Sequence, residues 1–301
     1  MIQIIIFSFN RAMQLDALLS SINFYWATSN YNVTIIYNTT DNNYDKGYNI
    51  LQQRYKNFAF IKETNIITEY PFQCYFSVFN LKKIIKYKHC RLQKSNFRKL
   101  LNSLISKTNA KFITFLTDDS IFIRDVKINQ EILSWIANNP YANSFSLRLG
   151  NNIDKPSKRL TIENNIINWK YSDFKKYKNW GYPFSVDGHI YEKKALMRIL
   201  SKVIFNNPST LEAHIYDYSL KHHLFNNGKS NIAPYILSYP LNMVQEVADN
   251  ESLGVSTELL NNYFLKGYSL IYPIPNNINS FQQYPQQITL KRENNEIQLN
   301  L

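Results

Sequence analysis

Three short polar segments stand directly behind apolar runs and carry side chains that could bind a phosphorylated ligand. They are Ser8-Phe9-Asn10-Arg11, Asn38-Thr39-Thr40-Asp41 and Thr117-Asp118-Asp119-Ser120. In an open α/β sheet, ligands bind beyond the carboxyl ends of the strands. If each apolar run is a strand of one sheet, the three segments meet at the same edge. The sequence therefore predicts a binding site at that edge.

The third segment contains two adjacent carboxylates, Asp118 and Asp119. Paired carboxylates at a strand end suit Mg²⁺ or Mn²⁺, which prefer oxygen ligands and often bind one or two carboxylates together with substrate phosphates. Such a cation screens the charge that develops on a nucleoside diphosphate leaving group. The alternative interpretation is that the two aspartates only cap a turn.

The composition sets wider limits on function. The chain has 301 residues, of which 45% are hydrophobic, enough for a substantial core. A net charge of +12 suits an anionic partner, and it equally suits a solvated basic surface. With two cysteines and no signal-peptide pattern before the apolar start, we expect a cytoplasmic protein. No apolar run approaches the roughly 18 residues that span a membrane.

The elements that must position the polar segments alternate between strand and helix patterns. Apolar runs predict strands over 2–9, 33–37, 58–62, 111–116 and 144–149. Helical spacing predicts helices near 15–22, over 76–108 and 129–137, near 193–203 and from 208 onward. This alternation predicts an α/β fold with a Rossmann-like, mixed but mainly parallel sheet flanked by helices.

Five motifs occur in an order that can be compared with known families. They are Phe7-Ser8-Phe9-Asn10-Arg11, Ser95-Asn96-Phe97-Arg98, the 112–122 segment FITFLTDDSIF, Pro208-Ser209-Thr210-Leu211-Glu212 and Asn242-Met243-Val244-Gln245. In this order they resemble the GT-A glycosyltransferases, and especially the bacterial inverting family 2-like enzymes. The 112–122 segment is similar to the DxD region of that superfamily. The likeness covers roughly residues 1–270.

The resemblance implies a site for a UDP- or GDP-sugar and a divalent cation, Mn²⁺ or Mg²⁺. Residues implied to line the nucleotide pocket are Phe9, Asn10, Arg11 and Thr39, with Asp118 near the ribose or base. Asp119 is implied as the main metal-binding carboxylate. Thr117 departs from the family pattern, which commonly has an acidic residue there, so cation dependence could be modest or Asp118 could share the metal role.

Inverting transfer needs a carboxylate that takes the proton of the acceptor hydroxyl. Glu212 and Asp187 are the candidates, and we prefer Glu212 because similar enzymes often hold their base after an N-capped turn. Asp187 could instead hold the acceptor sugar, and Glu212 could be a first-turn acid favoured by the helix dipole. His189 and His214 are candidates for a further metal ligand, with a hydrogen-bonded structural role as the alternative.

A basic cluster over 82–99 has three interpretations. Lys94 and Arg98 are closest in sequence to the metal strand, so they could help to neutralise the diphosphate. The remaining basic residues could contact an anionic membrane that carries a lipid-linked acceptor, at the inner face of the membrane. The third interpretation is a plain solvated helix surface.

The resemblance also sets the expected domains. We expect one GT-A domain over 1–272, with a nucleotide-sugar-binding half over 1–125 and an acceptor half over 126–272. Residues 151–178 are expected to form a long substrate loop. Residues 273–301, rich in Pro, Asn and Gln, are expected to be a C-terminal extension.

The predicted function is hexosyl transfer to a glycan or a lipid-linked acceptor. A sugar-phosphate nucleotidyltransferase is the enzymatic alternative, but it would need a glycine-rich phosphate loop, and no glycine precedes Gly47. A basic nucleic-acid-binding protein is the second alternative. No zinc-finger, homeodomain or RNA-recognition pattern accompanies the charge, so we expect no nucleic-acid partner.

Overall fold

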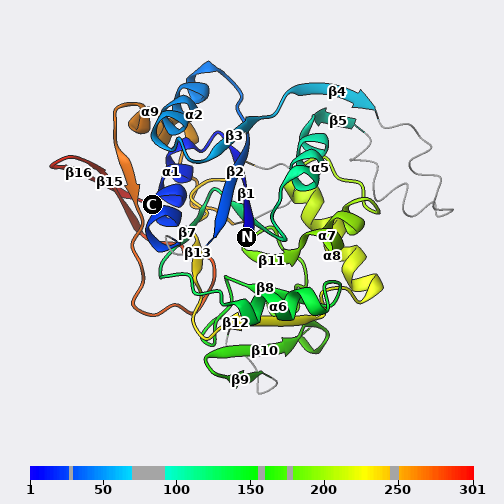
Figure 1. The fold of residues 1–301 in the computed structure, drawn as a ribbon. Helices are drawn as coiled ribbons and strands as arrows, with labels where there is room; N and C mark the ends of the chain where they lie inside the picture. The colour runs from blue at the N-terminus through cyan, green and yellow to red at the C-terminus, as the bar shows by residue number, and fades with distance from the viewer. Residues whose placement is uncertain (27–29, 70–91, 155–159, 175–178, 245–250) are drawn as a thin grey trace.

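A mixed sheet forms the centre of the protein (Figure 1). The computed structural model describes residues 1–26, 30–69, 92–154, 160–174, 179–244 and 251–301. Within these residues the sheet has nine strands in the order β3-β2-β1-β6-β11-β8-β12-β10-β9. Their bounds are β1 Ile2–Phe9, β2 Tyr31–Asn38, β3 Ala59–Lys62, β6 Phe112–Thr117, β8 Asn143–Ser146, β9 Thr161–Glu163, β10 Ile166–Lys170, β11 His189–Glu192 and β12 Asn227–Asn231.

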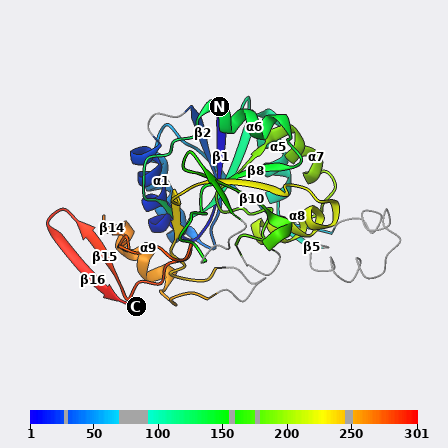
Figure 2. The ribbon, with the colours of Figure 1, turned by 90° about the horizontal axis from the view of Figure 1, so that it is seen from below.

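Helices cover both faces of this sheet (Figure 2). They are α1 Ala12–Tyr25, α2 Asn42–Arg54, α5 Phe97–Lys107, α6 Gln130–Asn138, α7 Lys193–Leu200, α8 Pro208–His222 and α9 Thr257–Leu265. Strand β1 shows why the layers form: Ile4 and Ile6 pack in the core with α1, whereas Ile5 and Phe7 pack in the core with α5 and α7. Alternate side chains point to opposite faces, so a continuous apolar strand requires cover on both.

Strand directions decide where the site lies. The neighbouring strands β3, β2, β1 and β6 are parallel, so their carboxyl ends lie at one edge. Strand β11 pairs antiparallel with both β6 and β8, so its start lies where those two strands end. Strand β10 likewise runs against its neighbours. The predicted α/β fold with a mixed, mainly parallel sheet and flanking helices is confirmed.

Two local predictions are wrong. The predicted helix over 76–108 lies partly outside the described residues, and within them β5, Leu92–Ser95, pairs antiparallel with β4, Asn65–Glu69, before α5 begins. The predicted loop over 151–178 contains β9, β10 and a 3-10 turn, η2, at Tyr171–Phe174. Asn164 and Asn165 join β9 to β10 with φ of 52° and 64°, and two successive positive φ angles are what a two-residue type I′ hairpin requires.

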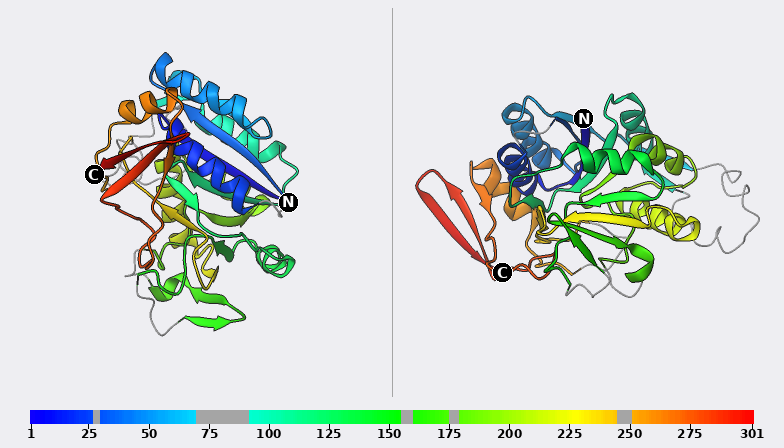
Figure 3. Two further views of the ribbon diagram at one scale, coloured as in Figure 1. Left: turned by 90° about the vertical axis from the view of Figure 1, so that its left-hand side faces the viewer. Right: turned by 60° about the horizontal axis from the view of Figure 1, so that its bottom comes forward.

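The C-terminal part adds further sheet structure. Strands β7, Ser120–Phe122, and β13, Ile236–Ser238, pair antiparallel. Strand β14, Ser269–Ile271, pairs with β15, Gln287–Arg292, which forms a hairpin with β16, Asn295–Asn300. Figure 3 shows this hairpin projecting beside α9. The β14–β15 pairing therefore crosses the predicted boundary at residue 272.

None of the helices in the described parts of the chain combines the length and the apolar character needed to cross a membrane.

Candidate active site at the carboxyl ends of β1 and β6

The three polar segments predicted to meet do lie together. Ser8, at the end of β1, donates a hydrogen bond to Asp118, which follows β6, at 2.7 Å. Asn10 joins the segment after β2, because its Nδ2 lies 3.0 Å from Thr40 Oγ1 and its Oδ1 accepts from the Thr40 amide at 3.0 Å. Asn10 has a φ of 55°, a left-handed conformation that asparagine tolerates better than most residues, and this turns the chain toward Thr40.

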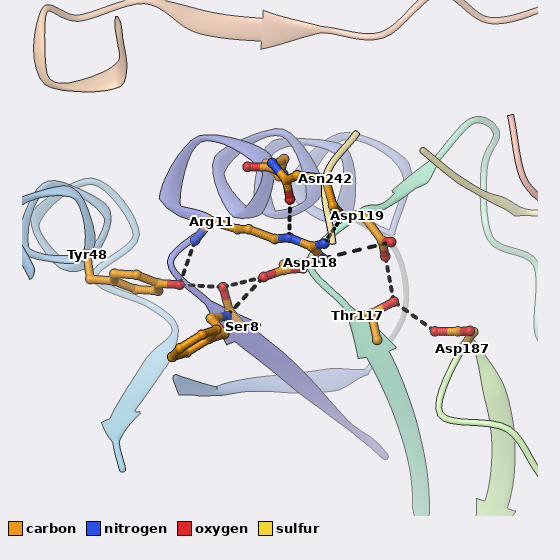
Figure 4. Close-up of polar contacts among 10 residues, drawn as sticks. Ser8, Arg11, Tyr48, Thr117, Asp118, Asp119, Asp187 and Asn242 are labelled. Carbon is orange, nitrogen blue, oxygen red and sulfur yellow. Dashed lines mark hydrogen bonds and ion pairs between the residues drawn. The ribbon is translucent and has the colours of Figure 1, made fainter. Parts of the chain in front are cut away.

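A buried ion pair between Arg11 and Asp118 forms the centre of the site (Figure 4). Arg11 Nη1 lies 2.9 Å from Asp118 Oδ1, while the other carboxylate oxygen accepts from Ser8 and from the Phe9 amide. Arg11 Nε donates to Asn242 Oδ1 at 2.6 Å, and its Nη2 donates to the Asn242 carbonyl. Both oxygens of Asp118 are thus occupied by groups of the protein.

Burial and the charge of the partner act in opposite directions on each member of the ion pair. Burial raises the pKa of Asp118 above its ordinary value, and the charge of Arg11 opposes this rise. Burial alone would lower the pKa of Arg11, but the charges of Asp118 and Asp119 raise it above its ordinary value. Tyr48 completes the network: its hydroxyl lies 2.6 Å from Ser8 Oγ and accepts from the Arg11 amide. Because the Ser8 proton goes to Asp118, Tyr48 donates to Ser8.

Asp119 is the more accessible carboxylate of the pair. Its side chain is 16% exposed, against 3% for Asp118, and Arg11 Nη1 lies 4.0 Å from its Oδ2. Its Oδ1 is 2.7 Å from Thr117 Oγ1. Asp119, the predicted metal-binding residue, is therefore the one of the two carboxylates that solvent can reach.

Thr117 connects Asp119 to a second carboxylate. Its Oγ1 lies 2.8 Å from Asp187 Oδ1, as well as close to Asp119. A hydroxyl has one proton and can donate only once. Both contacts are hydrogen bonds only if one of the two carboxyl groups supplies a second proton.

Asp187 reaches this position through strand pairing. In β11, Ile190 lies opposite Thr114 of β6, and His189 lies opposite Ser146 of β8. Continuing both registers places Asp187 between Thr117 and Arg148. Arg148 Nη1 is 3.7 Å from Asp187 Oδ2 and its side chain is 6% exposed.

The electrostatic setting of Asp187 is dominated by burial and by neighbouring carboxylates. Its pKa is raised to about 7 by burial and by the charge of Glu212, with a further contribution from Asp119. Arg148 and the hydrogen bond to Thr117 lower it. Asp187 therefore changes its protonation state near neutral pH, and the Thr117 hydroxyl can donate to it when it is ionised.

The residues immediately before and after Asp187 hold it in place. Glu212 Oε1 accepts from the amide of Val186 at 3.0 Å. Glu212 itself is placed by α8, which starts with a capping box between Asn207 and Thr210. Gly188 has a φ of 74°, and a Cβ there would lie 2.3 Å from Ile236 Cδ1, so the turn after Asp187 requires glycine.

The remaining predicted nucleotide residues have these positions. Phe9 and Thr39 lie at the ends of β1 and β2, and Thr39 Oγ1 donates to Asp45 at 2.7 Å. Arg98 lies in the first turn of α5, where it donates to the Val203 carbonyl at 3.3 Å and lies over the Phe205 ring. Lys94 has no described side chain, and residues 82–91 of the basic cluster lie outside the described residues.

The assignment of a metal to Asp119, with His189 or His214 as a further ligand, stays a prediction. In the described parts of the chain, no group of three or more His, Cys, Asp or Glu side chains could hold a metal ion. His189 is fully buried and its Nε2 lies 3.0 Å from the Tyr171 hydroxyl. His214 is buried in α8, where its Nδ1 contacts the Ile204 carbonyl. Both histidines are buried, and each ring contacts a group from another segment of the chain.

Sequence reasoning missed Arg148 and Tyr48. Arg148 was hidden inside a predicted strand over 144–149, whereas β8 ends at Ser146 and leaves Arg148 at the sheet edge. A predicted strand ending at Ser146 would have placed Arg148 beyond its carboxyl end, where ligands bind. Tyr48 lies in the middle of α2, and no local signal marks its contact with Ser8.

No family model matches the chain, and no curated protein matches it. It is similar to the solved structure of S. aureus TarS, with 11% identity, 88% of this chain and 38% of that chain covered, and a TM-score of 0.44. For S. aureus TarS 1-349 in complex with UDP, the identity is 10%, the coverage 88% and 62%, and the TM-score 0.41.

A third similar structure is the mannosyltransferase PcManGT from Pyrobaculum calidifontis in complex with GDP-Man and Mn²⁺. The identity is 11%, the coverage is 66% of this chain and 46% of that chain, and the TM-score is 0.36. The chain spans less than two thirds of the length of each of these three structures.

Proposed function

We propose that the protein is a glycosyltransferase that moves a sugar from a nucleoside diphosphate sugar to an acceptor hydroxyl. The observation that supports this most is the pairing of Asp119 with Asp187 through Thr117 at the carboxyl edge of the sheet. One carboxylate is partly exposed beside an arginine, and the second titrates near neutral pH. Sugar transfer needs these two functions next to each other: charge stabilisation at the leaving group and a base at the acceptor.

The donor would lie over the ends of β1 and β2. Asn10 and Thr39 would contact the nucleoside there, with Phe9 beside them, as the motif order implies. Asp118 has both oxygens committed to Arg11, Ser8 and Phe9, so its proposed role is to hold Arg11 in place rather than to bind the ribose. Arg11 is held between Asp118 and Asn242 and supplies a fixed positive charge near the diphosphate.

Asp119 fits the role of a cation ligand. One of its oxygens lies 4.0 Å from Arg11 and its side chain is 16% exposed, so a ligand can reach it. A site with one carboxylate and two phosphate oxygens is a common arrangement for Mg²⁺ and Mn²⁺. A bound cation would stabilise the negative charge of the departing nucleoside diphosphate.

Asp187, rather than Glu212, is the proposed base. A base works best when its pKa is near the working pH, and the pKa of Asp187 is raised to about 7. Glu212 accepts the Val186 amide and raises the pKa of Asp187, so we assign it to positioning the base and adjusting its pKa. Direct proton transfer from the acceptor to Asp187 corresponds to a single displacement, and hence to inversion.

The acceptor is proposed to be a glycan or a lipid-linked sugar. Tyr182 and Tyr216 stack at 4.2 Å, and Arg148 lies 5.9 Å from the Tyr182 ring centre. Tyr182 is partly exposed beside the Asp187–Glu212 pair, and the stacked Tyr182–Tyr216 rings are proposed to contact the acceptor sugar. The transferred group is proposed to be a hexose.

A donor-hydrolysis screen tests this function. UDP- and GDP-hexoses are incubated with the protein and Mn²⁺ or Mg²⁺, and release of the nucleoside diphosphate is measured. We expect release from one donor class, and we expect the Asp187→Asn variant to lose sugar transfer to an acceptor. The control is Asp125→Asn, an exposed carboxylate after β7. No release from any donor, together with synthesis of a nucleotide sugar from a nucleoside triphosphate and a sugar phosphate, would establish the nucleotidyltransferase alternative instead.

A further inference from the structure

Tyr272 lies beside the proposed donor site although it follows β14, far along the chain from β1 and β6. Its ring stacks on that of Tyr239 with centroids 4.3 Å apart. The amide of Tyr239 donates to the carbonyl of Asp119 at 2.8 Å. The chain after β13 thus places the Tyr272 ring next to the segment that carries Asp119.

The hydroxyl of Tyr272 is buried without a hydrogen-bond partner. The residue is 7% exposed, and its Oη has no partner among the described residues. Buried hydroxyl groups are almost always paired, and an unpaired one destabilises the fold. By contrast, the hydroxyl of the stacked Tyr239 donates to the Pro273 carbonyl at 2.7 Å. The Tyr272 hydroxyl therefore has a proton left to donate, whereas the Tyr239 hydroxyl already donates its own.

A second buried polar atom without a partner lies beside the Arg11–Asp118 ion pair. Asn242 is 5% exposed and accepts Arg11 Nε through its Oδ1, but its Nδ2 has no partner within the described residues. Two buried polar groups near Arg11 and Asp119 are thus left for a group that the chain itself does not supply. A ligand with several acceptor oxygens would satisfy both.

The charges near Tyr272 indicate which ligand that is. Burial raises the pKa of its phenol well above the ordinary value, and the charge of Asp119 raises it further, while Arg11 lowers it. The phenol therefore stays protonated at neutral pH and offers a neutral O–H donor. A donor that feels both an arginine and a carboxylate able to hold a cation suits a phosphate oxygen.

We propose that the Tyr272 hydroxyl donates a hydrogen bond to a phosphate oxygen of the nucleoside diphosphate group. This inference rests on the proposed function and extends the donor site to the segment after β14. The segment is well anchored for this purpose, because the amide of Ser238 donates to the Phe281 carbonyl at 3.1 Å and the Gln283 amide donates back to Ser238 at 2.8 Å.

Tyr272→Phe removes only the unpartnered hydroxyl, so it separates binding from folding. With Mn²⁺ present, affinities for UDP, GDP and uridine are measured by calorimetry, and Tm is measured without ligand. We expect the affinity for the bound diphosphate to fall about tenfold or more, since a hydrogen bond to a charged acceptor is lost. We expect an unchanged uridine affinity and an unchanged or higher Tm.

The matched control is Tyr235→Phe. Tyr235 is 3% exposed, but its hydroxyl is already bonded to the Lys127 carbonyl at 3.1 Å. This variant should lower Tm and leave the diphosphate affinity unchanged.

Three results would overturn the inference. Equal diphosphate affinity of Tyr272→Phe and the parent would show that the hydroxyl makes no contact with the ligand. An equal fall for uridine would assign it to the nucleoside. A fall in Tm like that of Tyr235→Phe would show that the hydroxyl serves the fold. Absence of any UDP or GDP binding by the parent would instead defeat the proposed function, and the inference with it.

Discussion

Asp187 and Thr117 face each other across antiparallel strands, with Asp187 Oδ1 2.8 Å from Thr117 Oγ1. This contact joins the two halves of the site, because Thr117 also contacts Asp119 at 2.7 Å. The threonine that departs from the acidic pattern of the GT-A motif is therefore the residue that links the proposed base to the proposed cation ligand.

Removing the Thr117 hydroxyl should shift the pH dependence of transfer. The hydrogen bond from Thr117 lowers the pKa of Asp187, so Thr117→Val should raise that pKa by about one unit. The acidic limb of the rate profile, measured as kcat against pH, should move upward by the same amount. Thr114→Val is the control, because Thr114 lies on the same strand and its buried hydroxyl has no partner among the described residues. A profile shifted equally in both variants would contradict this role.

The activity of the parent should rise with pH through about 7, because the base must be deprotonated and the pKa of Asp187 is raised to about 7. Asp187→Asn should lower kcat at least about 100-fold at pH 8. Initial rates of sugar transfer between pH 5 and 9 check both points. A rate that falls as pH rises through 7 would exclude Asp187 as the base.

The same raised pKa makes a prediction about stability. The folded state disfavours ionised Asp187, so its stabilising contribution is full below about pH 4, the ordinary value for aspartate, and is lost as pH rises to about 7. The Tm of Asp187→Asn minus the Tm of the parent should therefore be more positive at pH 8 than at pH 4. Thermal unfolding at the two pH values measures this difference, and an opposite sign would contradict the raised pKa.

The Arg11–Asp118 pair should be important for folding as well as binding. Arg11→Met leaves Asp118 buried and without its charged partner, which should lower the free energy of unfolding by about 3–5 kcal/mol. Arg54→Met provides the comparison, because Arg54 is 42% exposed and its partner Asp16 keeps a hydrogen bond from Tyr55 at 2.8 Å. Urea denaturation should show a clearly smaller loss for Arg54→Met. Equal losses would mean that the Arg11–Asp118 pair stabilises the fold no more than the Arg54–Asp16 pair does.

The glycine after Asp187 can be tested against a second glycine with the same conformation. Gly188 and Gly254 have φ of 74° and 71°, but only at Gly188 would a Cβ meet other atoms. Gly254→Ala should destabilise the protein by about 1–2 kcal/mol through backbone strain alone. Gly188→Ala should cost more and lower kcat, because Asp187 is displaced. Similar stability and kcat in the two variants would show that the contact with Ile236 is harmless.

The parts of the molecule that follow from local patterns could be predicted from the sequence. The apolar run of β1 and the polar residues behind it predicted a covered strand ending in a site, and Ser8 does contact Asp118 while Asn10 contacts Thr40. The β9–β10 hairpin also has a local turn signal in Asn164 and Asn165, although we predicted a loop there.

What could not be predicted depends on long-range pairing. Asp187 contacts Thr117, and through it Asp119, because β11 runs antiparallel to β6. Nothing in residues 187–192 specifies β6 as the partner strand. The same holds for Asp118, whose two oxygens are occupied only once Arg11 and Ser8 are in place. Sequence spacing could not predict that His189 and His214 are buried, because burial depends on the packed fold.

The most direct test of the central claim is a calorimetric titration of UDP and GDP in the presence and absence of Mn²⁺. We predict that one nucleotide binds the parent, that Mn²⁺ strengthens binding, and that Asp119→Ala abolishes this strengthening while Asp125→Ala does not. If Asp119→Ala binds both nucleotides as the parent does, with the same response to Mn²⁺, the assignment of Asp119 to the donor site is wrong.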